Sequence, residues 1–287
     1  MRFDKVVIVG SGKIACDCLR HLITILEKQY IVALETQENS LSMLRRICEK
    51  EHLDYSMLLK KRDIENYLLD TIKNKSVLIL SVNNRYIFTA DIINSPNVEI
   101  INFHYSLLPH YRGMNIPTWV IFNGETHTGI TWHFVTEQVD CGKIIEQRVF
   151  TITKETTAFD ITRQGMILGL EAFKSFSKKL LDEKIDGKEV VYPQNEKIYF
   201  NSCLPMNGIL NLNQPIDRIE TLLKSFDYGK TEVIPPLQLN YGEKRYVVQD
   251  YKIKEKENIL KRNLIIDEKT LILQEKDREI LLYLQEV

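Results

Sequence analysis

Apolar and polar residues follow two different periods along the first hundred residues. Short β-branched apolar runs, typical of buried strands, precede segments whose apolar residues recur at helical spacing. The expected strands cover residues 5–9, 31–34, 77–82 and 98–102, and the expected helices cover residues 14–26, 40–52 and 64–72, with Ser40 as the cap of the second helix. Strands that alternate with helices predict an α/β fold, a Rossmann-like and mostly parallel sheet with flanking helices.

The pattern changes beyond residue 127. Residues 128–135 and 143–152 read as two strands with a short turn between them, which predicts a hairpin or near-hairpin at the edge of the sheet. A long helix is expected at 157–182, and a short amphipathic helix at 215–226 precedes four short strands separated by charged turns. This organisation predicts a larger domain over residues 1–190 and a small, mostly β C-terminal module over residues 200–287.

Composition narrows the class of protein without identifying it. Of the 287 residues, 44% are apolar and 27% are charged, the balance of an ordinary soluble globular protein. The formal net charge of -1 provides no basic field for a broad nucleic-acid surface, and no stretch approaches the roughly 18 apolar residues of a membrane span. The five cysteines lack zinc-ribbon spacing and fit reduced thiols. We therefore expect a cytoplasmic protein without a metal or a membrane partner, as a monomer or a homodimer.

A glycine turn closes the first expected strand and opens the first helix. Gly10, Gly12 and Ala15 have the spacing of a dinucleotide fingerprint, and Glu35 follows the second strand, where such folds place a carboxylate for a ribose hydroxyl. The turn has two interpretations. In the first interpretation, Gly10, Ser11 and Gly12 bind a phosphate of the substrate at the helix N-terminus. In the second, the small residues serve only to pack a tight turn. Taken alone, the first interpretation also fits an NAD-dependent oxidoreductase.

A denser group of polar residues ends the fourth expected strand. Asn102 and His104 are two positions apart, so alternation along a strand points both side chains to the same face. The carboxyl end of a parallel strand is where open α/β sheets place their ligands. Asp140 lies in the turn after the strand at 128–135, from which its carboxylate can fold back towards His104. His133, on that strand, is expected in a core or supporting role.

The run NFHYSLLPHYRG, which begins at Asn102, together with Asp140 in the later VDCG turn, resembles the folate-dependent, methionyl-tRNA formyltransferase-like family. Members of that family formylate glycinamide ribonucleotide, initiator methionyl-tRNA, amino sugars or peptide-synthetase starter units. The resemblance implies 10-formyltetrahydrofolate as the formyl donor and a primary amine as the acceptor. The resemblance supports functional positions at Asn102, His104 and Asp140 without a unique division of roles. From the residue types, we expect Asn102 to donate to the oxyanion of a tetrahedral intermediate and Asp140 to orient the imidazole of His104. Our hypothesis is that His104 is the general base; when protonated, it would instead be a second oxyanion donor.

The same resemblance implies two sets of binding residues. The pterin of the donor is expected between the loop after the strand at 77–82 and the turn that carries Asp140. That set consists of Arg85, Tyr86, Ile87, Thr136, Glu137 and Val139. The acceptor is expected at the glycine turn and in the loop after His104, a set that consists of Gly10, Ser11, Gly12, Ser106, Tyr111, Arg112 and Gly113. Asn83 and Asn84 stand where relatives often have small residues, so side-chain contacts to the pterin stay open there.

The sequence leaves several classes of acceptor open. Methionyl-tRNA formyltransferases carry a long basic insertion after the second strand, whereas this chain has the short acidic segment 35–40, so tRNA is less favoured. A small-molecule amine, a nucleotide-linked amino sugar and a carrier-bound aminoacyl group remain. The stretches YFNSCLPMNG and KSFDYG resemble stand-alone relatives of peptide-synthetase formylation domains. They slightly favour an amino group of specialised metabolism, including a carrier-bound aminoacyl group, over an amino sugar. With water as the nucleophile, the same site would make a formyltetrahydrofolate hydrolase.

Replacement of His104 tests the general-base assignment. His104→Asn removes the imidazole but keeps a polar side chain, and loss of a general base costs at least ~10²-fold in rate. We therefore expect initial-rate assays to give a kcat/KM for formyl transfer at least about 100-fold below that of the wild type. A variant that keeps more than about a tenth of the wild-type kcat/KM would show that His104 is not the base.

Overall fold

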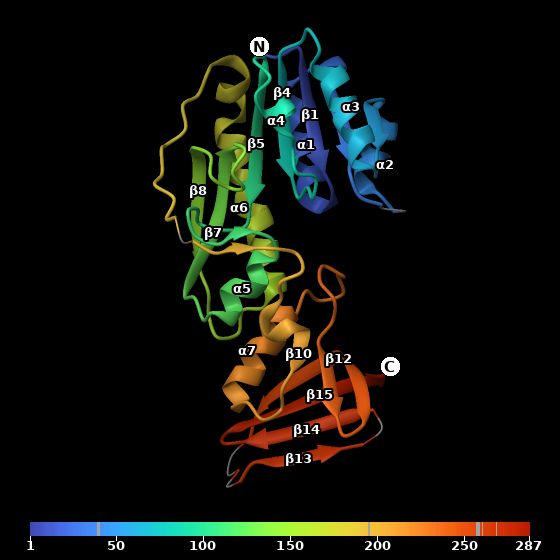
Figure 1. The fold of residues 1–287 in the computed structure, drawn as a ribbon, viewed down its shortest axis with the longest axis vertical. Coiled ribbons are helices and arrows are strands. Elements are labelled where there is room, and N and C mark those ends of the chain that lie inside the picture. Colours follow the sequence, from blue (N-terminus) through green and yellow to red (C-terminus); the bar gives the residue numbers. More distant parts are fainter. Residues whose placement is uncertain (39–40, 195, 257–258, 260, 268) are drawn as a thin grey trace. The chain divides into compact units, whose positions relative to one another are not determined.

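The computed structural model describes residues 1–38, 41–194, 196–256, 259, 261–267 and 269–287, and the chain forms two compact units (Figure 1). The first unit consists of Met1–Arg112, Thr128–Phe150 and Arg163–Ile198. The second unit consists of Gly113–His127, Thr151–Thr162 and Tyr199–Val287. Two short segments from the middle of the chain therefore belong to the same unit as the C-terminal residues.

A seven-stranded sheet forms the centre of the first unit. Its strands are β1 (Lys5–Gly10), β2 (Ile31–Glu35), β3 (Asp54–Met57), β4 (Val77–Val82), β5 (Val98–His104), β7 (His127–Phe134) and β8 (Ile144–Thr151). Their order is β3-β2-β1-β4-β5-β7-β8 (Figure 1). The pairs from β3 to β5 are all parallel, and β7 runs antiparallel to β5. The predicted α/β fold is confirmed, and β8 lies at the edge of the sheet beside β7, as the hairpin prediction required.

Both faces of this sheet are covered, and the alternation of β1 shows how. Val6 and Ile8 belong to an apolar cluster with helices α1, α2 and α6, whereas Val7 and Val9 belong to a second cluster with α3 and α4. These helices are α1 (Gly12–Ile25), α2 (Met43–Glu51), α3 (Lys61–Ile72), α4 (Ala90–Ile93) and α6 (Ala158–Asp182), and η1 (Lys28–Tyr30) is a short 3-10 turn. Burial on both faces explains why β1 reads as a continuous apolar run.

The start of α2 differs from the sequence prediction. The helix was expected to begin at residue 40, but it begins at Met43, and the Ser42 hydroxyl accepts a hydrogen bond of 3.0 Å from the Arg45 backbone N–H. Ser42 is therefore the capping residue. Ser40, the predicted cap, lies outside the described residues.

The second unit contains a six-stranded sheet in the order β10-β11-β12-β15-β14-β13 (Figure 1). Its strands are β10 (Ile209–Leu210), β11 (Gln238–Tyr241), β12 (Lys244–Glu255), β13 (Asn263–Ile266), β14 (Thr270–Glu275) and β15 (Arg278–Glu286). Helix α7 (Ile216–Phe226) packs Ile219 and Leu222 against Leu273 and Leu282 of the sheet. The unit also has α5 (Ile116–Phe122) and η2 (Pro205–Gly208). The short strands β6 (Arg112–Gly113) and β9 (Ile198–Tyr199) pair in a separate two-stranded sheet. Among the described residues, no helix combines the length and the apolar character that crossing a membrane requires.

Gly10 ends β1 directly beside the backbone of β4. A Cβ atom at this position would lie 1.8 Å from the carbonyl oxygen of Val82, its partner in the β1–β4 register. Backbone cannot move aside as a flexible side chain can, so only glycine fits where β1 turns into α1. Packing of the sheet alone thus accounts for the first glycine of the turn.

Substitution of Gly10 is expected to destabilise the first unit. For Gly10→Ala the overlap with Val82 must be relieved by backbone shifts, at a cost of about 2 to 3 kcal/mol in the free energy of unfolding. Gly12→Ala is the matched control, because Gly12 has φ +73° but its Cβ would meet only the Asn83 side chain at 3.3 Å. That variant should lose about 1 kcal/mol. Urea denaturation that finds Gly10→Ala no less stable than Gly12→Ala would contradict the steric argument.

Candidate functional site

The site begins on β5, at the point where strand direction in the sheet reverses. Asn102 lies opposite His133 of β7, and His104 lies opposite Thr131. Phe103, between them, belongs to the apolar cluster under α6, so alternation turns Asn102 and His104 to the other face. The structure thus brings the predicted pair to one face of the sheet.

One ring nitrogen of His104 is fixed by a hydrogen bond, and the other faces Asp140. Its Nε2 atom lies 2.7 Å from the carbonyl oxygen of Tyr111. A carbonyl only accepts, so Nε2 carries a proton and donates it there. Its Nδ1 atom lies 3.6 Å from Asp140 Oδ2, and both side chains are almost completely buried. Nδ1 is therefore the ring nitrogen without a proton in the neutral ring, and it faces the Asp140 carboxylate.

His133 joins the same group of side chains. Its Nδ1 atom lies 2.8 Å from the carbonyl oxygen of Phe134 and donates to it, which leaves Nε2 as the acceptor in the neutral ring. The Asn102 amide nitrogen lies 3.1 Å from that Nε2, and Asp140 Oδ1 lies 3.5 Å from it. His133 therefore orients Asn102, whose amide has a second N–H for an oxyanion. Sequence reasoning gave it only a core or supporting role, because the pairing of β5 with β7 could not be read from the sequence.

Asp140 lies in a turn that Arg112 holds in place. The buried Arg112 guanidinium donates from Nε and Nη2 to the carbonyl oxygen of Val139, at 2.9 and 2.6 Å. Asp140 itself has φ +52°, in the left-handed region. Next to it, burial raises the pKa of the Cys141 thiol, so this cysteine stays a neutral thiol rather than a nucleophile. The Arg112 guanidinium is thus bound to this turn. Its expected contact with the acceptor stays a prediction.

The loop after β5 is fixed by short polar contacts. The Ser106 hydroxyl donates to the carbonyl of His110 at 2.7 Å, and the Ser106 carbonyl accepts from Thr131 at 2.6 Å. Tyr111 has φ +58°, and its carbonyl is the one that binds His104. Gly113, at φ +101°, belongs to the second unit, where an added Cβ would lie 2.1 Å from the Tyr199 carbonyl. Acceptor binding by these residues stays a prediction.

The positions expected to meet a pterin lie near the carboxyl ends of β4 and β7. Arg85 and Ile87 are exposed, with 70% of Ile87 accessible. Tyr86 instead packs edge-on against Phe88 at 5.4 Å, and burial raises its pKa to about 12. The Asn84 side chain pairs with both backbone polar groups of Tyr86, at 2.9 and 3.0 Å. Hydrogen bonds from the Asn84 side chain thus hold the backbone of this loop at Tyr86.

The other half of the expected pterin pocket is the turn before Asp140. The Thr136 hydroxyl donates to the carbonyl of Gln138 at 3.0 Å, and the Glu137 carboxylate accepts from Asn94 at 2.7 Å. Val139 exposes 37% of its surface. An exposed valine in this turn and an exposed isoleucine in the loop after β4 are apolar surfaces of the kind that a flat heterocycle covers.

The glycine turn does not have the carboxylate that a dinucleotide needs. Glu35 is completely buried and accepts hydrogen bonds from the Ser42 hydroxyl and, at 2.6 Å, from the Tyr55 hydroxyl. The buried Ser11 is bonded to Gln37 and receives a bond of 3.3 Å from Asn83 at its carbonyl. Glu35 thus supports the end of β2 instead of facing a ribose, so the glycine turn lacks the carboxylate of a dinucleotide fingerprint.

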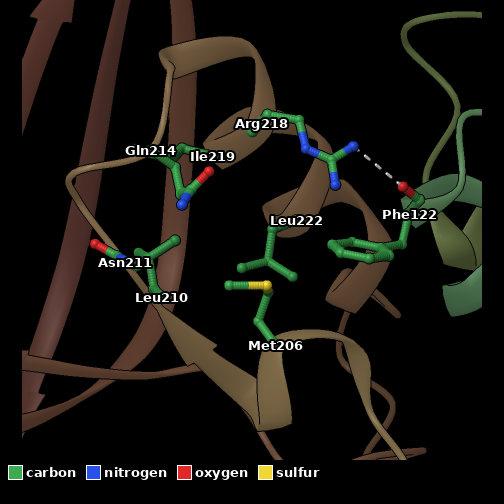
Figure 2. Close-up of a pocket in the computed structure, with 8 residues that line it drawn as sticks. All are labelled: Phe122, Met206, Leu210, Asn211, Gln214, Arg218, Ile219 and Leu222. Atoms are coloured by element: carbon green, nitrogen blue, oxygen red, sulfur yellow. Dashed lines mark hydrogen bonds between the residues drawn. The ribbon is translucent and has the colours of Figure 1, made fainter.

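Among the described residues, no group of three or more His, Cys, Asp or Glu is placed to hold a metal ion. The second unit has an open hollow of about 500 Å³ lined by residues that include Asn240, Lys244 and Glu286. The second unit has a cavity of about 30 Å³ beside α7, shown in Figure 2, where the Arg218 guanidinium lies 4.9 Å from the Phe122 ring centroid. A space of this size holds a water molecule but no nucleotide.

Comparison with known proteins gives a consistent result. Residues 6–174 match the formyl transferase family. The bifunctional polymyxin resistance protein ArnA of Wigglesworthia glossinidia brevipalpis is 30% identical over 153 residues, which cover 53% of this chain and 23% of that protein. The methionyl-tRNA formyltransferase of Clostridioides difficile is 29% identical over 197 residues, which cover 65% of this chain and 62% of that protein. The chain thus spans less than two thirds of either relative.

Several solved structures cover nearly the whole chain. Among them, a methionyl-tRNA formyltransferase from Clostridium thermocellum covers 99% of this chain and 99% of that one, at 13% identity and a TM-score of 0.60. Another is an N-formyltransferase from Helicobacter canadensis in complex with folinic acid and dTDP-3-aminofucose. The TM-score is 0.73 at 17% identity, over 98% of this chain and 99% of that one. At this identity the likeness establishes the fold, and it extends through the β-rich second unit.

The contacts of His133 generate a specific prediction. His133→Ala removes the acceptor that orients the Asn102 amide, and misplacement of a reacting group costs about 10- to 100-fold in rate. We expect kcat/KM to fall by about that factor, while the thermal melt shows a folded protein. His127→Ala is the matched control, since His127 is exposed at the start of the same strand and should keep full activity. Unchanged turnover in a folded His133→Ala protein would exclude the orienting role.

Proposed function

The chain belongs to the formyl transferase family, and on that premise we propose that it transfers a formyl group from 10-formyltetrahydrofolate to the amino group of a nucleotide-linked sugar. The observation that carries this proposal is the convergence of Asn102, His104 and Asp140 at the end of β5, where strand direction reverses. An amide donor, an imidazole and a carboxylate are the groups that acyl transfer to an amine requires.

The proposed reaction assigns each group a step. The acceptor amine attacks the formyl carbon, and the second N–H of Asn102 binds the oxyanion that forms. His104 Nδ1 takes the proton of the attacking nitrogen, while its Nε2 proton stays on the Tyr111 carbonyl. Asp140 stabilises the resulting imidazolium. The same Nδ1 proton then passes to N10 of the folate as the C–N bond to the formyl carbon breaks, which releases tetrahydrofolate and the formamide.

The donor is supported by two exposed apolar positions, Ile87 in the loop after β4 and Val139 in the turn next to Asp140. It is also supported by the Helicobacter canadensis structure, which is in complex with folinic acid, a formylated reduced folate. We place the pterin between these two loops. The reaction as proposed needs no metal, since oxyanion and proton are both handled by side chains.

The acceptor is inferred from the closeness of the structural likeness. Sequence motifs from residue 199 onwards slightly favour an amino group of specialised metabolism, such as a carrier-bound aminoacyl group. The protein in complex with dTDP-3-aminofucose and the Clostridium thermocellum methionyl-tRNA formyltransferase both cover at least 98% of the chain, but the TM-score of the first is 0.73 and that of the second is 0.60, which supports a nucleotide-linked amino sugar. Methionyl-tRNA is the second candidate, because the Clostridioides difficile enzyme matches over 65% of this chain. The net charge of -1 weighs against tRNA.

An acceptor panel tests the proposal. The protein and 10-formyltetrahydrofolate are combined with dTDP- and GDP-linked amino sugars, initiator methionyl-tRNA, an aminoacyl carrier protein, or no acceptor, and tetrahydrofolate release is followed. We expect turnover with an amino sugar and a product heavier by one formyl group in mass spectrometry. Turnover with methionyl-tRNA alone would favour the second candidate, and equal release without any acceptor would identify a hydrolase.

His110→Asn serves as the control for that panel. His110 lies in the loop after β5, but its side chain is exposed and its Nδ1 atom faces Glu196 at 3.3 Å. Its replacement should leave the acceptor preference unchanged.

A further inference from the structure

A short segment of the first unit, residues 186–194, runs along the turn that carries Asp140. We refer to it as the strap. Its Lys188 exchanges backbone hydrogen bonds of 2.7 and 2.9 Å with Ile144, the first residue of β8. The Lys143 ammonium forms ion pairs with Asp186 and Glu189, at 3.1 and 2.9 Å. These contacts fasten the strap immediately after the turn.

Tyr192 makes two different contacts with this region. Its hydroxyl donates a hydrogen bond of 2.8 Å to the carbonyl of Gly142. Burial, followed by the nearby Cys141 and Asp140, raises the Tyr192 pKa to about 12, so the hydroxyl stays a donor at neutral pH. The Arg112 guanidinium lies 5.8 Å from the ring centroid of Tyr192, within the range of a cation–π contact.

The two contacts of Tyr192 involve residues on either side of Asp140 in the sequence. Gly142 follows it by two residues, and Val139, whose carbonyl binds Arg112 twice, precedes it directly. Asp140 has the left-handed φ of +52°, a conformation that is unfavourable for a residue with a Cβ and needs support from its neighbours. Tyr192 supports both flanks, one directly and one through Arg112.

We propose that Tyr192 is a positioning residue: acting from the strap, it holds the turn 136–142 in the conformation that places Asp140 beside His104 and His133. Nothing in the run of residues from Asn102 to Gly113, nor in the VDCG turn, identifies Tyr192. Its kinetic consequence rests on the proposed function, whereas its structural consequence does not. The two are therefore tested separately.

Hydrogen exchange of the unliganded protein tests the structural consequence. The reporter is the Cys141 amide, which donates to the Gln138 carbonyl within the turn. In Tyr192→Ala we expect this amide to exchange at least about tenfold faster, and Tyr192→Phe, which keeps the ring under Arg112, to show a smaller increase. Val191→Ala is the matched control, because Val191 is the next residue on the strap and 90% exposed. Equal exchange rates in Tyr192→Ala and Val191→Ala would overturn the proposal.

A double-mutant cycle tests the kinetic consequence. If Tyr192 acts through Asp140, Tyr192→Ala in the otherwise wild-type protein should lower kcat about tenfold with little change in the acceptor KM. In an Asp140→Asn background, the same substitution should lower kcat less than about twofold. A merely structural contribution would cost the same factor in both backgrounds, and that result would overturn the proposal. If the wild type transfers no formyl group at all, the proposed function fails, and the exchange rates still decide whether Tyr192 holds the turn.

Discussion

The register between β5 and β7 is the constraint on which the rest of the site depends. Side chains alternate along a strand, so a slip of one residue would send Asn102 and His104 into the apolar cluster and bring Phe103 out. In the observed register Asn102 lies opposite His133, and that pairing fixes the orientation of the amide. Antiparallel β7 leads away from the carboxyl end of β5 and ends with Phe134 opposite Ile101, so the turn that follows must fold back for Asp140 to reach His104.

The side chains of the site are oriented by polar contacts with their neighbours. The Tyr111 carbonyl fixes the tautomer of His104, and the Phe134 carbonyl fixes that of His133. Asp140 lies between the two imidazoles, at 3.6 and 3.5 Å. Buried polar groups interact strongly because little water screens them, so the position of one carboxylate affects both rings. For the proposed formyl transfer, the conformation of the turn that carries Asp140 is therefore as important as strand β5, which carries His104.

The sequence predicted those features that depend on local periodicity. The helix expected at 157–182 is observed as Ala158–Asp182, and the same-face placement of Asn102 and His104 followed from strand alternation. Features that depend on contacts between distant segments could not be predicted. The carboxylate of Glu35 looked available for a ribose, but it is buried against Ser42 and Tyr55. The short elements β3 and α5 were also missed, because four and seven residues carry too little periodic signal.

The central claim is that the side chains brought together by β5 and β7 surround a formyl group during its transfer. The most direct measurement is a crystal structure of the protein with a stable folate analogue bound that carries its formyl group on N10. The account predicts the pterin between the loop after β4 and the turn before Asp140, with the formyl carbon within about 4 Å of Asn102 Nδ2 and His104 Nδ1. A folate bound elsewhere, or a formyl carbon more than about 8 Å from both atoms, would contradict it.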